Sequence, residues 1–490
     1  IKTTKSKNLY TLTVLYANCM RFINRKKELQ FVEESCQLSK RKLFSLVVYG
    51  LRRIGKTRLI QESIKKGGLY FFITKNKTSS SLLREFEGIL KENKIITDLE
   101  SLTDWDSFFK TLFERYEGTV AFDEFQNFNG IDKSIYGILQ KYIDLNEKKK
   151  NLLLIFSGST IGLIKKIFYD NKESLYGRVK RKLFLKPLNQ SSIIEMCKEL
   201  NIKNIEEIVK LYSIFGGFPK YYVAIEDENL EGKSFEDILE ELFFRENAVL
   251  EDEVERILAL EFGKRKGRYY DILTAIADGE NTISKISSFL SKKESKITRY
   301  LNELLYYFEI ISQEKQVIGN KKIFVIKNPI MNFWFSLFYK NLSAYKSRRS
   351  SFIEQKKKDI NIYIGRQFET FCREFLLSRQ IFKFDEIGKQ WGKFKGEKGK
   401  NVYEIDIVAL NKNTKEILFG ECKWKDNVNA EKVLQELKEK SKFVDWNKEK
   451  RKDSYAIFAK SFKKRTKDCY CFDLKDISKQ LRSSKTKTKK

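Results

Sequence analysis

The sequence predicts an α/β fold built on an open parallel sheet, because short apolar runs alternate with helical segments along its first 190 residues. The stretches at 79–93 and 104–116 carry apolar residues at helical spacing. The runs expected to form buried strands are 46–49, 69–73, 119–122 and 151–156. Ligands of such sheets lie outside the carboxyl ends of the strands, so polar residues that follow these runs are candidate site residues.

The first strand leads into a glycine-containing loop, and a helix is expected directly after it. The loop has the spacing G-x4-G-K-T and consists of Gly50, Leu51, Arg52, Arg53, Ile54, Gly55, Lys56 and Thr57. Backbone N–H groups of such a loop converge on phosphate oxygens, and the helix N-terminus adds positive partial charge. We expect Lys56 to reach the β- and γ-phosphates of ATP and Thr57 to bind Mg²⁺. The alternative is a surface loop that matches by chance.

Polar residues follow two of the later strands. Asp123 and Glu124 end the third run about 70 residues beyond the loop, where Asp123 would hold Mg²⁺ through water and Glu124 would orient the attacking water. Ser159 follows the fourth run and is placed to sense the γ-phosphate; the alternative is a helix cap. Arg178 could contact the γ-phosphate in cis or in trans, but chemistry alone does not distinguish it from the other 95 basic residues.

Taken in order, these pieces resemble the archaeal ATPase family, a branch of the AAA+/STAND P-loop ATPases. The matching pieces are Phe22 to Arg25, Tyr49 to Thr57, Phe122 to Gln126, Ser157 to Ser159, Leu175 to Arg178 and Phe215 to Pro219. The resemblance implies a P-loop ATPase core over 20–187 and a helical lid over 188–262. It also implies that Arg178 is an arginine-finger candidate, that Ser159 is a sensor, and that Pro219 lies near the nucleotide.

Residues 263–338 are expected to form a winged helix. Two short helices are followed by an apolar stripe at helical spacing from Ile297 to Phe308, and then by a hairpin that turns near Gly319. The segment 293–308 would be the recognition helix, with Lys293, Lys296, Arg299 and Asn302 on its outer face. The alternative is a winged helix used only for packing within the chain. A polar, basic connector over 339–360 follows.

The remaining domain, 361–478, carries a second set of acidic residues. Asp406 lies on one expected strand, and Glu421 and Lys423 alternate onto one face of the next. Two carboxylates and a lysine can hold Mg²⁺ and stabilise a pentavalent phosphate. The layout resembles the PD-(D/E)xK nuclease superfamily, although Ile405 stands where its proline is usual. The resemblance implies that Glu369, Asp406 and Glu421 are metal ligands and that Lys423 is catalytic. A degenerate domain that keeps only the fold is the alternative.

Composition restricts the remaining possibilities. The net charge of +30 favours polyanionic partners such as DNA. The alternative explanations of the many charged residues are that they keep the protein soluble or adapt it to heat. The absence of histidine excludes Ser-His and Cys-His catalysis. Seven cysteines without a paired framework suit a reducing cytoplasm, and no apolar run approaches the roughly 18 residues of a membrane span. We expect residues 1–19 to be a disordered extension before Met20, and 479–490 to be a basic tail.

The sequence therefore predicts a cytoplasmic ATPase that uses ATP and Mg²⁺, that is a candidate homo-oligomer, and that has no membrane partner. Its nucleotide cycle would control an action on DNA, which the C-terminal domain would either cut or only bind. The alternative function is a non-catalytic regulator, in which nucleotide occupancy switches assembly or DNA binding and the nuclease-like domain is degenerate.

Overall fold

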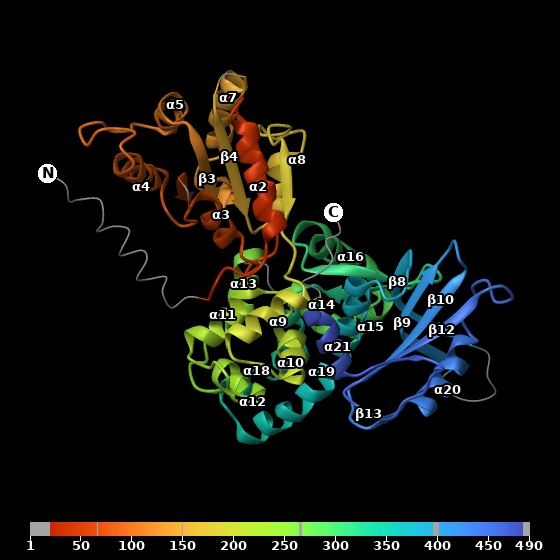
Figure 1. Ribbon diagram of the computed structural model, residues 1–490. Helices are drawn as coiled ribbons and strands as arrows, with labels where there is room; N and C mark the ends of the chain where they lie inside the picture. The colour runs from red at the N-terminus through yellow and green to blue at the C-terminus, as the bar shows by residue number, and fades with distance from the viewer. Residues whose placement is uncertain (1–19, 66, 149, 264–266, 395–400, 484–490) are drawn as a thin grey trace.

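The computed structural model describes residues 20–65, 67–148, 150–263, 267–394 and 401–483. The N-terminal body contains a five-stranded parallel sheet in the order β2-β3-β4-β1-β5, shown at the top of Figure 1. Its strands are β1 Phe44–Tyr49, β2 Leu69–Phe72, β3 Gly118–Asp123, β4 Leu152–Gly158 and β5 Arg181–Phe184. The predicted parallel α/β fold is confirmed.

Helices cover both faces of this sheet and separate successive strands. They are α2 Lys26–Ser39, α3 Lys56–Ile64, α4 Ser79–Glu92, α5 Trp105–Arg115, η1 Phe125–Asn127, α6 Phe128–Ile131, α7 Ser134–Asn146 and α8 Ile161–Tyr169. Val47 and Phe122 pack into one buried apolar cluster, whereas Val48 and Ile60 pack into a second cluster on the opposite face. Because β1 is buried on both sides, the loop at its carboxyl end has a fixed position.

A group of helices follows the sheet over the residues where the lid is predicted, 188–262, and we keep the name lid for it. It comprises α9 Gln190–Glu199, α10 Ile205–Phe215, α11 Pro219–Asp227, α12 Phe235–Leu239, the π-helical turn η2 Glu240–Phe244, and α13 Glu253–Phe262. Gly217 lies against the strand-to-lid connection, where a Cβ atom would come within 2.0 Å of the carbonyl oxygen of Leu188. This close backbone approach explains why glycine precedes Pro219 in the lid.

Three helices and an antiparallel hairpin form the next module. They are α14 Gly267–Ala277, α15 Ile283–Phe289, α16 Glu294–Asn302, the π-helical turn η3 Glu303–Tyr307, β6 Ile311–Lys315 and β7 Lys322–Ile326. The segment expected to be one helix over 293–308 widens into η3 at its end. Its apolar stripe points inward, since Ile297, Leu301 and Leu304 are buried. The helix α17, Pro329–Leu337, closes the module.

The expected connector at 339–360 is mostly helical and continues into the last domain. It contains η4 Tyr339–Asn341, α18 Leu342–Lys346 and the first part of α19, which spans Ser350–Arg379. The thirty residues of α19 cross the expected domain boundary at 361 without a break. The boundary therefore lies within one continuous helix.

A mixed sheet in the order β14-β12-β10-β9-β8 forms the C-terminal domain. Its strands are β8 Glu386–Lys393, β9 Val402–Asn411, β10 Glu416–Lys423, β12 Lys452–Ala459 and β14 Tyr470–Phe472, with α20 Ala430–Ser441, α21 Leu474–Arg482 and the small pair β11 Val428–Asn429 and β13 Phe462–Lys464. Leu481 is buried, so the basic tail expected from 479 begins inside a helix. Two predicted segments lie outside the described residues, namely the extension 1–19 and the tail from 484 onward. The structure also does not describe 395–400.

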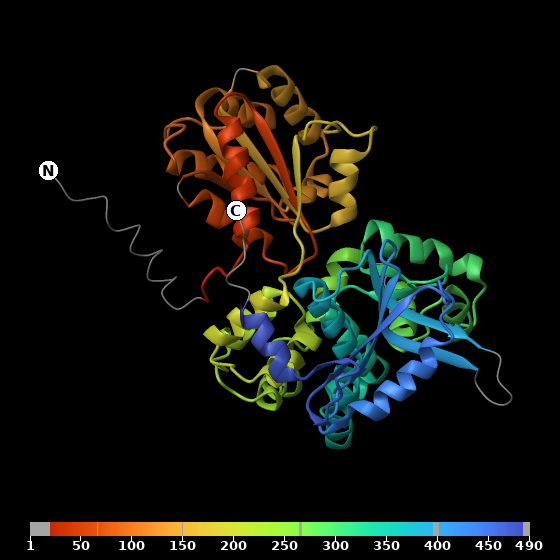
Figure 2. The same cartoon turned by 45° about the vertical axis from the view of Figure 1, so that its right-hand side comes forward.

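The lid and the C-terminal domain share one interface. In Figures 1 and 2, α21 lies beside α9 and α10. The Tyr212 hydroxyl of α10 donates a hydrogen bond of 2.7 Å to Glu374 of α19. The Gln190 amide of α9 donates a bond of the same length to the Phe371 carbonyl. These bonds connect the lid directly to the long helix that enters the C-terminal domain.

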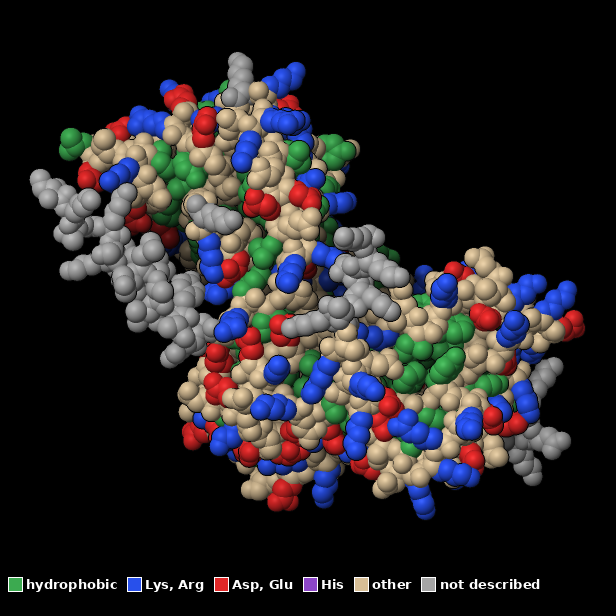
Figure 3. All heavy atoms as spheres, viewed as in Figure 1, with side chains coloured by type: hydrophobic (Ala, Val, Ile, Leu, Met, Phe, Trp, Pro, Cys, Tyr) green, Lys and Arg blue, Asp and Glu red, His purple; other side chains and the backbone are tan. Residues whose placement is uncertain are grey.

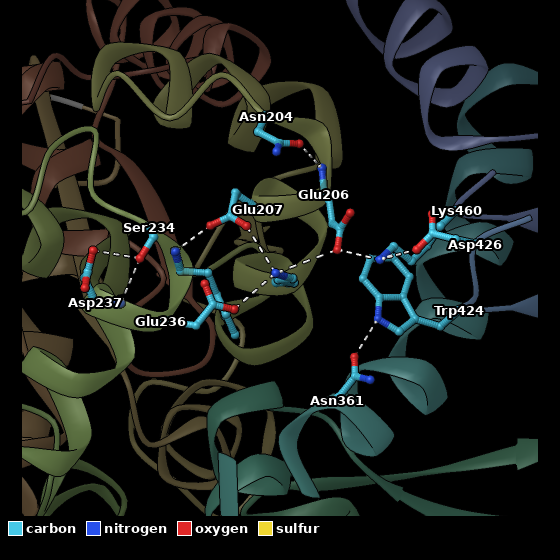
Figure 4. Close-up of polar contacts among 12 residues, drawn as sticks. Asn204, Glu206, Glu207, Ser234, Glu236, Asp237, Asn361, Trp424, Asp426 and Lys460 are labelled. Carbon is cyan, nitrogen blue, oxygen red and sulfur yellow. Dashed lines mark hydrogen bonds and ion pairs between the residues drawn. The ribbon is translucent and has the colours of Figure 1, made fainter. Parts of the chain in front are cut away.

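Figure 4 shows a polar part of this interface. The Lys460 ammonium lies 2.7 Å from Glu206 of α10 and 2.9 Å from Asp426, and it also lies over the ring of Trp424. The Trp424 indole donates in turn to Asn361 of α19. One lysine thus connects the lid to both the sheet and the long helix of the C-terminal domain.

The surface carries charges of both signs. On the face shown in Figure 3, Lys and Arg side chains are interspersed with Asp and Glu over both halves of the molecule. Within the part of the chain that the structure describes, no helix is long and apolar enough to span a membrane.

Candidate functional site

The glycine-containing loop joins β1 to α3 at the carboxyl edge of the N-terminal sheet. Gly55 has a positive φ of 91°, and a Cβ on Gly50 would lie 2.6 Å from the Leu185 carbonyl oxygen, so both positions favour glycine. The buried Lys56 ammonium donates to the carbonyl oxygens of Gly50, at 3.0 Å, and Leu51, at 2.9 Å. Burial lowers the pKa of Lys56 to about 8, although Glu124 and Asp123 oppose that shift.

The two acidic residues at the end of β3 contact this loop and β4. Asp123 accepts hydrogen bonds from the Thr57 hydroxyl, at 2.6 Å, and from the Tyr70 hydroxyl, at 2.8 Å. Glu124 has a left-handed backbone, with φ 55°, and accepts a 2.7 Å hydrogen bond from the Ser159 hydroxyl. The structure thus brings together Lys56, Thr57, Asp123, Glu124 and Ser159, as the sequence predicts. Tyr70 was not predicted.

Two arginines of the loop form ion pairs with the lid. The Arg52 guanidinium lies 2.7 Å from Glu261, and that of Arg53 lies 2.8 Å from Glu253; both carboxylates belong to α13. Burial raises the pKa of Glu261, and the charge of Arg52 opposes this. Helix α13 is thereby connected to the loop by two ion pairs that the sequence did not predict.

A cavity of about 480 Å³ opens beside the loop. Its wall includes Arg52, Arg53, Ile54, Gly55, Lys56, Thr57, Glu124, Ser159 and Pro219, all of them predicted site residues. Apolar side chains form another part of the wall, namely Met20, Phe22, Ile23, Leu188 and Met196. A polar loop that faces an apolar wall suits a ligand with a phosphate group and an aromatic base.

Residues 20–25 were not predicted to line the site, although Phe22 to Arg25 is one of the pieces that carry the family resemblance. Arg25 is buried at the start of α2 and donates to the carbonyl oxygens of Lys186, at 2.7 Å, and Ile54, at 3.1 Å. These bonds fix the N-terminal segment to the loop and to the connection between β5 and the lid. The position of the apolar segment beside the cavity follows from this anchor.

Arg178 lies away from the loop of its own chain. It pairs with Asp144 of α7 at 3.1 Å, and its carbonyl accepts a bond from Ser45 at the start of β1. The loop follows the opposite end of β1, so Arg178 lies at the other end of this strand from the residues that would bind the γ-phosphate. A role in trans stays a prediction.

A second cluster, which we call the acidic centre, consists of Glu369 on α19, Asp406 on β9 and Glu421 on β10. Asp406 accepts a 2.8 Å bond from the Cys422 backbone N–H. Burial, and then the charges of Glu369 and Glu421, raise the pKa of Asp406 to about 7. Asp406 therefore lies close enough to Glu369 and to Glu421 for both charges to act on its carboxyl group.

Lysines neutralise this centre. Glu421 contacts Lys423 at 2.8 Å and Lys440 of α20 at 2.9 Å, while Lys389 of β8 lies 2.8 Å from Glu369. Carboxylate oxygens are suitable ligands for Mg²⁺. Yet among the described residues, no three acidic or thiol side chains are arranged as a ready metal site. The predicted residues therefore meet, but in a lysine-paired arrangement, and the involvement of Lys440 was not predicted.

Comparison with known proteins agrees with these features. An ATPase domain predominantly from Archaea matches residues 22–225, and a domain of archaeal and bacterial proteins of unknown function matches 334–434. An uncharacterized protein of Methanocaldococcus jannaschii is 31% identical over 474 residues, which cover 93% of this chain and all of that protein.

Similarity to a solved structure supports the fold of the N-terminal part of the chain. The Walker-type ATPase of Pyrococcus abyssi superposes with a TM-score of 0.52 at 23% identity, covering 64% of this chain and 96% of that one. The ORC2 protein of Aeropyrum pernix gives 0.46 at 14% identity, covering 69% and 96% of the two chains. Because the M. jannaschii relative is similar over its whole length and the ATPase domain matches residues 22–225, the chain belongs to a predominantly archaeal family of P-loop ATPases.

Proposed function

We propose that the protein binds and hydrolyses ATP at residues 50–57, with Mg²⁺. One observation carries this proposal: Lys56, Thr57, Asp123, Glu124 and Ser159 meet at the carboxyl edge of the sheet, beside a cavity of about 480 Å³. Backbone N–H groups at the start of α3 and a buried ammonium both favour a triphosphate at this place.

The residues divide the chemistry between them. Thr57 and Asp123 are the oxygen donors that would hold Mg²⁺, which supplies positive charge to the phosphates when bound. Lys56 would exchange its bonds to the loop carbonyls for bonds to phosphate oxygens. Glu124 would orient a water molecule toward the γ-phosphate, with Ser159 fixing the carboxylate by the 2.7 Å bond.

The action controlled by this cycle would be exerted on DNA. The support is the net charge of +30, the exposed basic residues Lys293, Lys296 and Arg299 around α16, and the nuclease-like order of elements around the acidic centre. In this proposal the winged helix binds DNA and the C-terminal domain cuts it in the cytoplasm. Arg178 would act in trans within a homo-oligomer.

A second candidate is a nucleotide-switched regulator that binds DNA without cutting it. The observation that favours it is the pairing of Glu369 with Lys389 and of Glu421 with Lys423 and Lys440. Carboxylates occupied by lysine side chains are less available to a metal ion. The two candidates share the ATP site and differ only in the chemistry of the C-terminal domain.

Replacement of the loop lysine tests the ATP site. Lys56→Ala should lower ATP turnover by at least about 100-fold, because it removes a preorganised charge that faces the γ-phosphate. Phosphate release measured with the purified full chain reports the effect. Lys172→Ala, an exposed lysine beyond α8, serves as the control and should leave turnover unchanged. Turnover that survives in Lys56→Ala would show that ATP is hydrolysed elsewhere.

The lowered pKa of Lys56 predicts a pH dependence. Since the nucleotide-free pKa is about 8, the ammonium loses its proton as the pH rises from 7 to 9, and ATP affinity should fall by about tenfold. In Lys56→Arg the charge persists over this range, so the affinity should stay nearly constant. Equal pH profiles for the two proteins, measured by equilibrium binding, would contradict the assignment of the titrating group.

Cleavage of DNA separates the two candidates. The wild-type chain should nick plasmid or single-stranded DNA in the presence of Mn²⁺ or Mg²⁺, and Asp406→Ala should not, because a buried carboxylate of the centre is lost. Asp445→Ala, at an exposed position in the same domain, is the matched control and should cut normally. If the wild type shows no metal-dependent nicking with any nucleotide, the result supports the second candidate, a regulator that binds DNA without cutting it.

A further inference from the structure

Lys389 holds an unusual position in the C-terminal domain. It lies on the edge strand β8, yet its ammonium turns toward the acidic centre and reaches Glu369 at 2.8 Å and Glu404 at 2.5 Å. Only about a fifth of the side chain is exposed. A lysine held between two carboxylates contributes the positive charge that a bound cation would otherwise supply.

The opposite side of the centre is arranged in the same way. Glu421 is nearly buried and contacts Lys440 through both of its oxygens, at 2.9 and 3.0 Å, in addition to Lys423. These contacts draw Glu369 and Glu421 toward lysines on opposite flanks of Asp406. This explains why neighbouring carboxylates do not form a ready metal site among the described residues.

The hairpin β6–β7 fixes the strand that carries Lys389. At its turn, the Val317 N–H donates to the carbonyl of Lys389 itself at 3.3 Å. The side chain of Gln390, which is buried, accepts from the Ile318 N–H at 2.9 Å and donates to the Ile318 carbonyl at 3.1 Å. The tip of the hairpin therefore binds the C-terminal sheet directly beside the lysine.

The same hairpin also contacts the helix that carries Glu369. Arg373, one turn further along α19, lies 2.9 Å from Glu314 of β6. The hairpin thus contacts both elements that present the Lys389–Glu369 pair. A change in the position of the hairpin would alter the distance between the two charges.

We infer that Lys389 is a built-in counter-cation of the acidic centre, which a divalent cation displaces from Glu369, and that the hairpin tip positions it. This inference rests on the acidic centre of the proposed function. The displaced ammonium becomes available to a phosphate oxygen, so one lysine serves the centre in both states. Without the divalent cation, Lys389 holds Glu369 in place; with the cation bound, Lys389 is available to bind phosphate.

Binding of Mn²⁺ to the nucleotide-free full chain tests this inference without relying on activity. Lys389→Met should bind Mn²⁺ about tenfold more tightly than the wild type, because a competing positive charge is removed. Lys393→Met, an exposed lysine on the same strand, is the control and should match the wild type. Free Mn²⁺ can be followed by its electron paramagnetic resonance signal. Lys389→Gln, which keeps a hydrogen-bond donor, provides a second variant should the methionine variant not fold.

Two further variants make the result specific. Asp406→Asn should remove the Mn²⁺ site. Gln390→Ala should tighten binding as Lys389→Met does, though less strongly, because it removes the two side-chain hydrogen bonds between β8 and the hairpin tip. If an Asp406-dependent site exists and both Lys389 variants bind Mn²⁺ as the wild type does or more weakly, the inference is wrong and the proposed function stands. If no variant shows an Asp406-dependent site, the inference and the cleavage proposal fail together, and the ATPase assignment is unaffected.

Discussion

The buried ammonium of Lys56 is the constraint on which the N-terminal half depends. It is removed from water and bonded only to carbonyl oxygens of its own loop in the contacts described, with Glu124 and Asp123 near enough to favour its charge. Such a group is stable only where the backbone curls tightly around it, which the glycines at 50 and 55 allow. A triphosphate would satisfy the same charge with stronger, charge-assisted hydrogen bonds.

Side-chain contacts connect the loop to the lid, and they connect the lid and the hairpin to the C-terminal domain. Arg52 and Arg53 join it to α13, the lid joins α19 through Tyr212, and the hairpin joins β8 through Gln390. Each contact pairs groups that are partly or fully buried, so breaking one would leave a charge or a donor unsatisfied. Such connections favour movement of the lid and the C-terminal domain as one unit when the site is occupied.

Much of the fold and of the nucleotide site could be predicted because local spacing determines them. Glycines, Lys56 and Thr57 are adjacent in sequence, and alternation along β9 and β10 places Asp406 and Glu421. Local spacing does not show which residues of distant elements will contact the site. The contacts of five such residues depend on tertiary packing, namely Tyr70, Arg25, Glu253, Glu261 and Lys440. For the same reason, the sequence could not show that Arg178 lies at the start of β1, or that one helix continues from the connector past residue 361.

Hydrogen exchange of the full chain, with and without a non-hydrolysable ATP analogue, is the most direct test of the central claim that a phosphate bound at residues 50–57 is sensed by the lid. The account predicts slower exchange in the loop, at the start of α11 and along α13, because Pro219 lines the cavity and α13 is paired to the loop. Binding of the analogue with unchanged exchange in the loop, or with changes confined to the loop and absent from α11 and α13, would contradict it.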